Sequence, residues 1–122
     1  MSNDRDLRYL TYIKTSIELI EERARGKSYE RFLEDVDMQD SILWRLQTLG
    51  EATGRLSEDV KNRHPRVRWR AIYGFRNIAA HGYIELNLDL IWEIVNLHLE
   101  ELKIVVTEEM SRFEDSVNPE EA

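Results

Sequence analysis

Three residues within one short segment, Arg76, His81 and Tyr83, are suited to chemistry at a phosphodiester. The guanidinium of an arginine is permanently charged, and its planar fork matches the oxygens of a phosphate. A histidine can take up or release a proton near neutral pH. The spacing Arg-x4-His-x-Tyr therefore predicts a site that binds a phosphate group and transfers a proton beside it.

The position of these residues sets a condition for that chemistry. On a continuous α-helix, Arg76 and His81 would point about 140° apart, which is too far for one site. Gly82 follows directly, and glycine commonly ends a helix. If the helix ends at His81, the imidazole lies on the last turn and can approach Arg76. The negative end of the helix dipole then favours the charged imidazole, which suits a general acid.

RNA is the phosphodiester that suits this motif, because its 2′-hydroxyl is a built-in nucleophile. Cleavage needs a base for that hydroxyl, an acid for the leaving oxygen and positive charge near the phosphorus. None of these roles requires a metal or another cofactor, and we expect none. One chain has a single motif histidine, so a two-fold homodimer with facing motifs would provide both proton-transfer groups.

The net charge of −7 disfavours RNA binding, but the charges are unevenly distributed. Residues 60–82 contain six bases and no acid, so this segment carries +6 and leaves −13 for the rest of the chain. Such a stripe is typical of a phosphate-binding surface when its members share one face. The alternative is a solvated helix face whose bases pair with acids from elsewhere in the fold. The bases expected to contact RNA beside the motif are Arg66, Arg68 and Arg70.

The apolar residues repeat at spacings of three and four, as in amphipathic helices, and no stretch alternates in the manner of a β-strand. We expect a first helix over about residues 4–25, with Gly26 as its stop signal. Ser28 can cap a short helical turn after it. A second long helix is expected to start near Asp37 or Asp40.

The second half of the chain continues the helical pattern. Ser57 is expected to open a short helix that ends at His64, because the residue before a proline disfavours helix. A motif helix is expected over 68–80, and a last helix, capped by Asn87, runs to about residue 113. Long amphipathic helices joined by short loops predict an all-α, up-and-down bundle with four to five main helices.

Length and composition indicate one domain, since the chain has 122 residues of which 42% are apolar and 34% charged. We place the domain at residues 1–113 and a disordered acidic tail at 114–122. The absence of cysteine removes disulfides, zinc–thiolate sites and a cysteine nucleophile. No signal peptide is visible, and no apolar run approaches the about 20 residues of a membrane span. We therefore expect a cytoplasmic protein without a membrane contact.

Several segments, in one order, resemble the HepT-like family of HEPN-domain ribonuclease toxins. The first is the segment Arg-Asn-Ile-Ala-Ala-His-Gly-Tyr at 76–83. A Gly-Glu-Ala element stands at 50–52, a Pro-Arg-Val-Arg-Trp segment at 65–69 leads into the motif, and Trp-Glu-Ile-Val stands at 92–95. The resemblance covers about residues 5–110, and its motif has no gap or substitution.

The resemblance implies a homodimeric, metal-independent endoribonuclease that is the toxin of a prokaryotic toxin–antitoxin pair. The implied antitoxin is a small nucleotidyltransferase of the MntA type, which transfers AMP onto the motif tyrosine, here Tyr83. A bulky anionic group at this position would block the site and repel a phosphate backbone. By the same resemblance, Arg76 orients the scissile phosphate, His81 transfers the proton and Asn77 is a supporting polar contact.

Two further groups of residues need an interpretation. By resemblance Glu51 lies near the motif, where it could orient Arg76; the alternative is an ordinary surface acid. Trp44, Trp69 and Trp92 are interpreted as core residues rather than as stacking platforms for bases.

Other patterns point away from chemistry. Asp35, Asp37 and Asp40 lack the glycine and the distal glutamate of a calcium loop and are interpreted as helix-capping acids. His64 is interpreted as an ordinary loop residue. Two functional alternatives remain beside the ribonuclease: a non-catalytic helical module that binds nucleotides or a nucleotidyltransferase partner, and a plain structural dimer.

Overall fold

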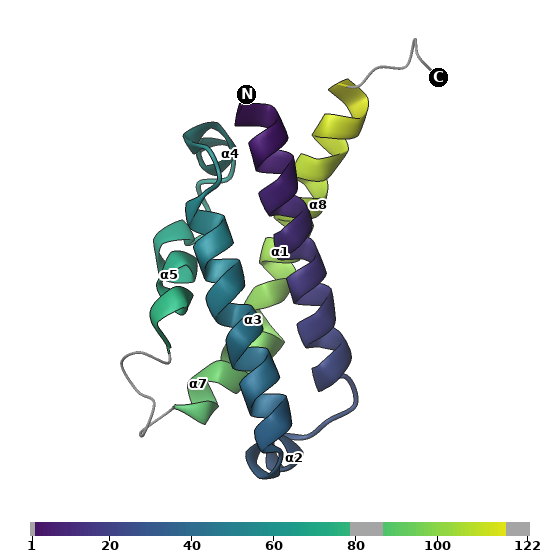
Figure 1. Ribbon diagram of the computed structural model, residues 1–122, viewed down its shortest axis with the longest axis vertical. Coiled ribbons are helices and arrows are strands. Elements are labelled where there is room, and N and C mark those ends of the chain that lie inside the picture. The colour runs from purple at the N-terminus through teal and green to yellow at the C-terminus, as the bar shows by residue number, and fades with distance from the viewer. Residues whose placement is uncertain (1, 79–86, 117–122) are drawn as a thin grey trace.

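The computed structural model describes residues 2–78 and 87–116, which Figure 1 shows as a ribbon. His81, Gly82 and Tyr83 lie outside the described residues, as do residues 117–122 of the expected tail. Within the described ranges there is no β-strand, which confirms the expected all-α fold. None of the helices in these ranges is long and apolar enough to cross a membrane.

The helical segments are α1 (Ser2–Ala24), α2 (Tyr29–Glu34), α3 (Val36–Gly54), α4 (Glu58–Arg63), α5 (Trp69–Tyr73), η1 (Gly74–Asn77), α7 (Leu88–Glu93), η2 (Ile94–His98) and α8 (Leu99–Ser116).

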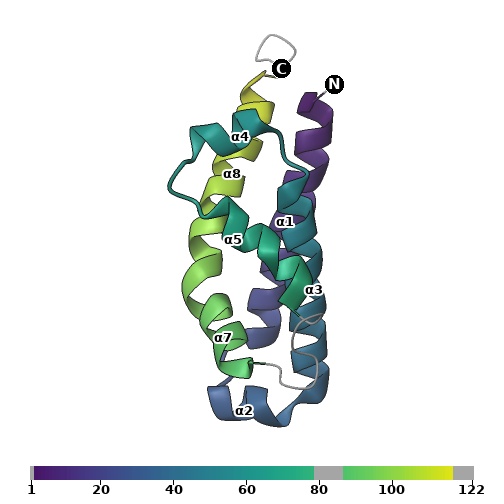
Figure 2. The same ribbon diagram turned by 90° about the vertical axis from the view of Figure 1, so that its left-hand side faces the viewer.

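The long segments run up and down, as expected for a bundle. In Figure 1, α1 descends from the N-terminus and α3 returns beside it, while α5 and η1 descend next to α3. The segments α7, η2 and α8 then lead back to the end of the molecule where α1 begins. α1 packs against both α3 and α8. The short helices α2 and α4 lie at the two ends of the bundle (Figure 2).

The inner faces of α1, α3 and α8 meet in one apolar core. Burial of a leucine or isoleucine side chain contributes about 1.5–3 kcal/mol, so this core is the main source of stability. The predicted stripes of α1 and of the last helix both face it. Among the described residues, the apolar ones with no exposed surface are Leu10, Ile13, Ile17, Ile20, Phe32, Ile42, Leu46, Leu49, Val60 and Val106.

Polar side chains begin four of the helices, largely as the sequence predicts. The side chains of Ser28, Asp35, Ser57 and Asn87 each accept a hydrogen bond from the backbone N–H three residues further on. These bonds satisfy N–H groups that have no partner inside the helix. α3 begins at Val36, slightly earlier than expected, because Asp35 is its cap.

The motif segment lies very close to α3, because two glycines face it. A Cβ added at Gly50 would lie 2.8 Å from the carbonyl oxygen of Ile72 and 3.0 Å from the backbone nitrogen of Arg76. A Cβ at Gly54 would lie 2.3 Å from the nearest ring carbon of Tyr73. The two glycines are four positions apart and therefore share one face of α3. A side chain at Gly50 would therefore meet the backbone of the motif segment, and one at Gly54 would meet the ring of Tyr73.

The motif segment differs from the single α-helix expected over 68–80. α5 ends at Tyr73, and Gly74–Asn77 form a 3₁₀ turn, η1, that contains Arg76. A 3₁₀ helix has three residues per turn, so the angle calculated for Arg76 on a continuous α-helix does not apply.

The last helix is longer than expected and interrupted. Ile94–His98 form a π-turn, η2, between α7 and α8. A π-turn accommodates one extra residue per turn and is usually found as a single turn within an α-helix. α8 continues to Ser116, so the helix extends beyond the end expected at Phe113.

One of the three tryptophans is interpreted wrongly from the sequence. The side chain of Trp44 is 60% exposed on α3 and does not belong to the core. Ile42 and Leu46, two positions to either side, are fully buried. A helical residue two positions from both points to the opposite side of the helix. Trp69 and Trp92 pack against the core, as expected.

The close contact at Gly50 can be tested against an open glycine. We expect Gly50→Ala to lower the free energy of unfolding by about 1–3 kcal/mol, because the added methyl meets backbone atoms. Gly74 is the matched control: its dihedral angles are helical, and a Cβ there meets nothing within 4 Å. Gly74→Ala should raise the free energy of unfolding by about 0.5–1 kcal/mol. Thermal unfolding followed by circular dichroism measures both, and a higher Tm for Gly50→Ala would contradict the close contact.

Candidate active site

Arg76 is exposed but restrained in position. Its backbone lies against Gly50 of α3, and its side chain projects into solvent. The guanidinium carbon lies 4.1 Å from the centre of the Tyr73 ring. A cation at this distance from an aromatic face is held by the charge distribution of the ring. Arg76 is therefore accessible to an anion. Its contact, the uncharged ring of Tyr73, leaves the positive charge of the guanidinium unneutralised.

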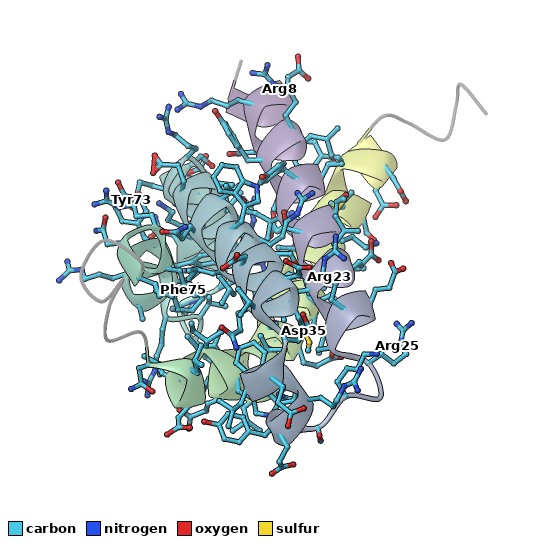
Figure 3. All side chains as sticks on the ribbon, turned by 60° about the horizontal axis from the view of Figure 1, so that its bottom comes forward. Arg8, Arg23, Arg25, Asp35, Tyr73 and Phe75 are labelled. Carbon is cyan, nitrogen blue, oxygen red and sulfur yellow. The ribbon has the colours of Figure 1, made fainter. Side chains whose placement is uncertain are left out.

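Tyr73, which lies outside the Arg-x4-His-x-Tyr motif, links Arg76 to α3. Its ring occupies the space that a side chain at Gly54 would need. Figure 3 shows Tyr73 and Phe75 on the side of α3 where α5 and η1 pack. The signal in the sequence is the pair of glycines four residues apart, of which the Gly-Glu-Ala element marks only the first.

A buried carboxylate on α8 fixes the start of the motif segment. Glu109 is 1% exposed, and its two oxygens accept hydrogen bonds from Nη2 and Nε of Arg63, at 2.7 and 3.1 Å. Nε2 of His64 lies 2.6 Å from Oε2 of Glu109. The carbonyl oxygen of His64 accepts a hydrogen bond of 3.0 Å from Nε1 of Trp69. These contacts connect α8 to the first residue of α5.

The charges of this cluster depend on each other. Burial raises the pKa of Glu109, but hydrogen bonds from Arg63 and His64 outweigh burial and bring the pKa below its ordinary value of 4.5. The hydrogen bond to Glu109 raises the pKa of Arg63. His64 is thus more than the loop residue expected from the sequence. The missed signal is an acid three positions after Val106, on the apolar stripe of the last helix.

The cations of the basic segment fall into two groups. Nζ of Lys61 lies 3.8 Å from the carboxylate of Glu58, and Arg63 is paired with Glu109. In Figure 2, the segment from α4 through α5 faces the viewer. The alternative of paired bases thus holds for Lys61 and Arg63, whereas phosphate binding by the other bases stays a prediction. Four arginines are exposed and form no ion pair with any residue that the structure describes: Arg66, Arg68, Arg70 and Arg76.

Glu51 lies next to Gly50 but has a partner of its own. Its carboxylate lies 3.6 Å from Nε of Arg55, one turn further along α3. Both residues line a groove between α1 and α3, which Tyr9 and Tyr12 also line. The structure therefore places Glu51 in an exposed ion pair on α3, and such pairs contribute little to stability.

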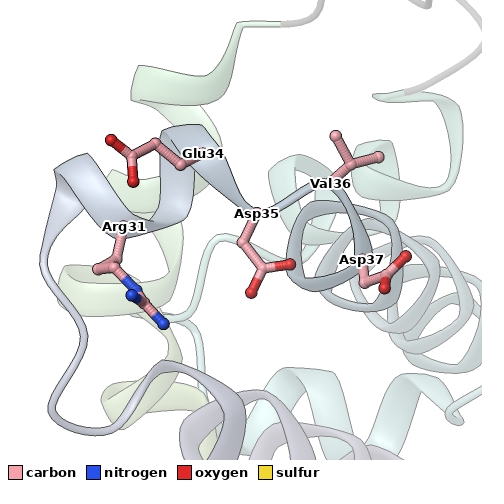
Figure 4. A pocket seen from close by; sticks show the side chains of 5 residues that line it. All are labelled: Arg31, Glu34, Asp35, Val36 and Asp37. Atoms are coloured by element: carbon pink, nitrogen blue, oxygen red, sulfur yellow. The ribbon is translucent and has the colours of Figure 1, made fainter.

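A depression between α2 and α3 collects acidic residues but has a structural explanation. It is lined by Arg31, Glu34, Asp35, Val36 and Asp37 (Figure 4). The carboxylate of Asp35 caps α3, which is the role expected for it. The carboxylates of Glu34 and Asp37 point apart on either side of Asp35. In residues 2–78 and 87–116, no group of three or more His, Cys, Asp or Glu residues is arranged to hold a metal ion.

The described part of the motif consists of Arg76, Asn77 and Ile78, and its one charged group, the Arg76 guanidinium, is exposed. Asn77 follows Arg76 directly, is half-buried and ends η1. His81, Gly82 and Tyr83 lie outside the described residues, so the expected helix end at His81 stays a prediction. The fork of Arg76 can bind two phosphate oxygens, and the three exposed arginines before it can contact neighbouring phosphates.

Comparisons with known proteins agree with this chemistry. The chain matches the family described as "Ribonuclease HepT-like" over residues 13–109. A protein of Thermococcus cleftensis named "Probable ribonuclease HepT" is 34% identical over 95 residues, which cover 78% of this chain and 86% of the relative. The "mRNA nuclease HepT" of Shewanella oneidensis is 27% identical over 126 residues, which cover 83% and 92%, respectively. No solved structure matches the chain.

The Glu109 cluster predicts a pH dependence of stability. Because the folded pKa of Glu109 is below 4.5, its ionised pair stabilises the fold above about pH 4.5 and this contribution is lost as the pH falls through the folded pKa. Glu109→Gln should lower the free energy of unfolding near neutral pH by about 2 kcal/mol. This is less than the about 3–5 kcal/mol of fully buried pairs, because Arg63 is 37% exposed.

Denaturant unfolding between about pH 7 and pH 3 measures this dependence. The wild type should lose stability in acid more steeply than Glu109→Gln. Glu101→Gln, which changes an exposed acid on the same helix, should keep the wild-type slope. Equal slopes for the wild type and Glu109→Gln would contradict the assigned role of the buried carboxylate.

Proposed function

Since the chain belongs to the HepT-like ribonuclease family and is an RNA-cleaving enzyme, we propose that it is the toxin of a prokaryotic toxin–antitoxin pair and acts in the cytoplasm. The proposed activity is metal-independent endonucleolytic cleavage by the Arg-x4-His-x-Tyr motif. One observation carries the proposal: the guanidinium of Arg76 is exposed and held over the ring of Tyr73. The three arginines of the segment before it also lack an ion-pair partner among the described residues.

The proposed reaction is an internal transfer within RNA. The 2′-oxygen attacks the phosphorus and the bond from phosphorus to the 5′-oxygen breaks, which leaves a 2′,3′-cyclic phosphate and a 5′-hydroxyl. Arg76 orients the phosphate and stabilises the negative charge that develops on its oxygens. His81 takes the proton of the 2′-hydroxyl or gives a proton to the 5′-oxygen. Asn77 adds a polar contact beside Arg76.

Two copies of the chain complete the proposed site. One motif histidine cannot be protonated and deprotonated at the same moment, whereas two histidines across a two-fold axis can divide the roles of acid and base. Arg66, Arg68 and Arg70 bind phosphates that flank the scissile one. Their contribution depends on salt, because each phosphate contact releases counterions.

Regulation is proposed to act on Tyr83. A small nucleotidyltransferase of the MntA type transfers AMP from ATP to the phenol oxygen, and pyrophosphate leaves. The modified tyrosine carries a negative charge and a bulky nucleotide two residues from His81. Both effects oppose RNA binding, since the added charge repels the phosphate backbone and the nucleotide occupies the space that the RNA would need.

Growth arrest tests whether His81 is catalytic. Expression of the wild type should stop growth, and His81→Ala should not, because proton transfer is lost. His98→Ala is the matched control: it replaces an exposed histidine of η2 and should arrest growth like the wild type. The toxin proposal would have to be abandoned if His81→Ala arrested growth equally, or if neither protein arrested it.

Cleavage rates of the purified protein test the role of Arg76. Arg76→Ala should lower the rate of RNA cleavage by about 100-fold, the usual effect of removing one group that stabilises transition-state charge. Arg76→Lys should recover only part of this loss, because an ammonium lacks the planar fork. Arg23→Ala, which removes an exposed arginine of α1, should leave the rate unchanged. Full activity of Arg76→Ala would show that Arg76 does not bind the scissile phosphate.

Mass spectrometry tests the modification. After incubation with the partner nucleotidyltransferase and ATP, the wild type should gain one or more AMP groups and lose RNA cleavage. Tyr83→Phe should gain none, because it lacks the phenol oxygen. AMP found on another residue while Tyr83 stays free would refute the proposed regulation.

A further inference from the structure

Three large apolar side chains are exposed at intervals of seven residues along the last helix. Leu90 is 45% exposed, Leu97 66% and Ile104 51%. Leu90, Leu97 and Ile104 form the outer ridge. Leu90 and Leu97 line one surface depression together with Tyr29 and Trp92, so they share one side of the molecule. Ile104 follows Leu97 by seven positions, about two turns further along the helix. Exposed apolar side chains that share one side of a molecule can mark an interaction surface.

The π-turn η2 contributes to the outer ridge. Ile94 and Leu99 are five positions apart, the repeat of a π-turn, and both are buried. Between them, Asn96, Leu97 and His98 are all exposed. Leu97 is thus the most exposed large apolar side chain in the described part of the chain. Burial within this chain gives no reason for its position.

Acidic side chains surround the outer ridge. Four exposed glutamates lie three or four positions from a ridge residue: Glu93, Glu100, Glu101 and Glu108. None of the four forms an ion pair within 4 Å with a residue that the structure describes. Residues 88–116 contain eight acids and two bases. Both bases have acidic neighbours already, since Lys103 donates to Glu21 at 2.8 Å and Arg112 lies 3.8 Å from Glu109.

Charge decides between the possible occupants of this surface. Unpaired carboxylates repel RNA and anionic membranes. A second copy of the chain in a two-fold contact would place the same acids opposite each other. A helix with apolar residues at heptad spacing and Lys or Arg beside them matches both the ridge and its acids. We propose that the outer ridge docks a cationic amphipathic helix of a partner protein.

This surface differs from the proposed cleavage site in its elements and in its charge. The cleavage motif begins at Arg76 on η1 and is preceded by the exposed Arg70 on α5 and by Arg66 and Arg68 just before α5. The outer ridge, in contrast, lies on α7, η2 and α8 among exposed glutamates. The docking proposal does not rest on RNA cleavage. A protein without ribonuclease activity could still bind the helix, and an active ribonuclease could fail to bind it.

A pair of labelled peptides tests the proposal with the full chain. One peptide has Leu at positions a and d of each heptad and Lys elsewhere, and the other has Glu in place of each Lys. Fluorescence anisotropy should show the Lys peptide bound at least about tenfold more tightly than the Glu peptide. The double substitution Leu97→Ser and Ile104→Ser should weaken binding of the Lys peptide about tenfold or more, because two apolar contacts are lost.

Control variants distinguish specific binding at the outer ridge from nonspecific hydrophobic binding and from misfolding. Leu33→Ser removes a leucine that is 43% exposed on α2 and should leave the affinity unchanged. The pair Glu93→Gln and Glu101→Gln keeps the apolar ridge, and its binding should depend less on salt than that of the wild type. Circular dichroism and RNA cleavage should match the wild type for all these variants.

Three results would overturn the proposal. The first is equal affinity for the two peptides. The second is an affinity for the Lys peptide that the double substitution Leu97→Ser and Ile104→Ser leaves unchanged. The third is self-association of the wild type, measured by light scattering, that this double variant loses. That third result would assign the outer ridge to a second copy of the chain.

Discussion

The contact of α3 with the motif segment at Gly50 and Gly54 fixes the position of Arg76, and with it the place of the proposed site. Hydrogen in place of a side chain at these positions lets the backbone of Arg76 and the ring of Tyr73 lie directly on α3. Tyr73 then holds the guanidinium of Arg76 from a distance of 4.1 Å. An aromatic partner restrains an arginine without cancelling its charge, as a carboxylate would. Close helix packing and the position of the Arg76 guanidinium therefore depend on the same two glycines.

The acidic residues of this chain include a buried group and an exposed group. Inside the fold, Glu109 neutralises Arg63, contacts His64 and so fixes the start of the motif segment. On the surface, the glutamates of the outer ridge have no ion-pair partner among the described residues. The unpaired cations and unpaired acids thus belong to different elements. A net charge of −7 consequently says little about the binding of RNA, which depends on the local field.

Local signals in the sequence predict most of the helices, because a cap or a stop depends only on residues within one turn. Ser28, Ser57 and Asn87 cap the expected helices for this reason. The 3₁₀ turn at Arg76 and the π-turn are not predictable in this way, since no local pattern distinguishes these turns from an α-helix. The Glu109 cluster is predictable in part. An acid on an apolar stripe indicates a buried ion pair, but the sequence does not identify the partner of that acid. Arg76 and Asn77 are placed by the structure, whereas the roles of the motif residues come from resemblance.

The 2′-hydroxyl of RNA is the proposed nucleophile at Arg76 and His81, and one substitution in the substrate tests it directly. Purified protein is incubated in EDTA with two RNA strands that differ only by a 2′-deoxy nucleotide at the cleaved position. The proposed mechanism predicts cleavage of the all-RNA strand to a 2′,3′-cyclic phosphate and no cleavage at the deoxy position. Cleavage of both strands at the same bond, or loss of cleavage in EDTA, would contradict it.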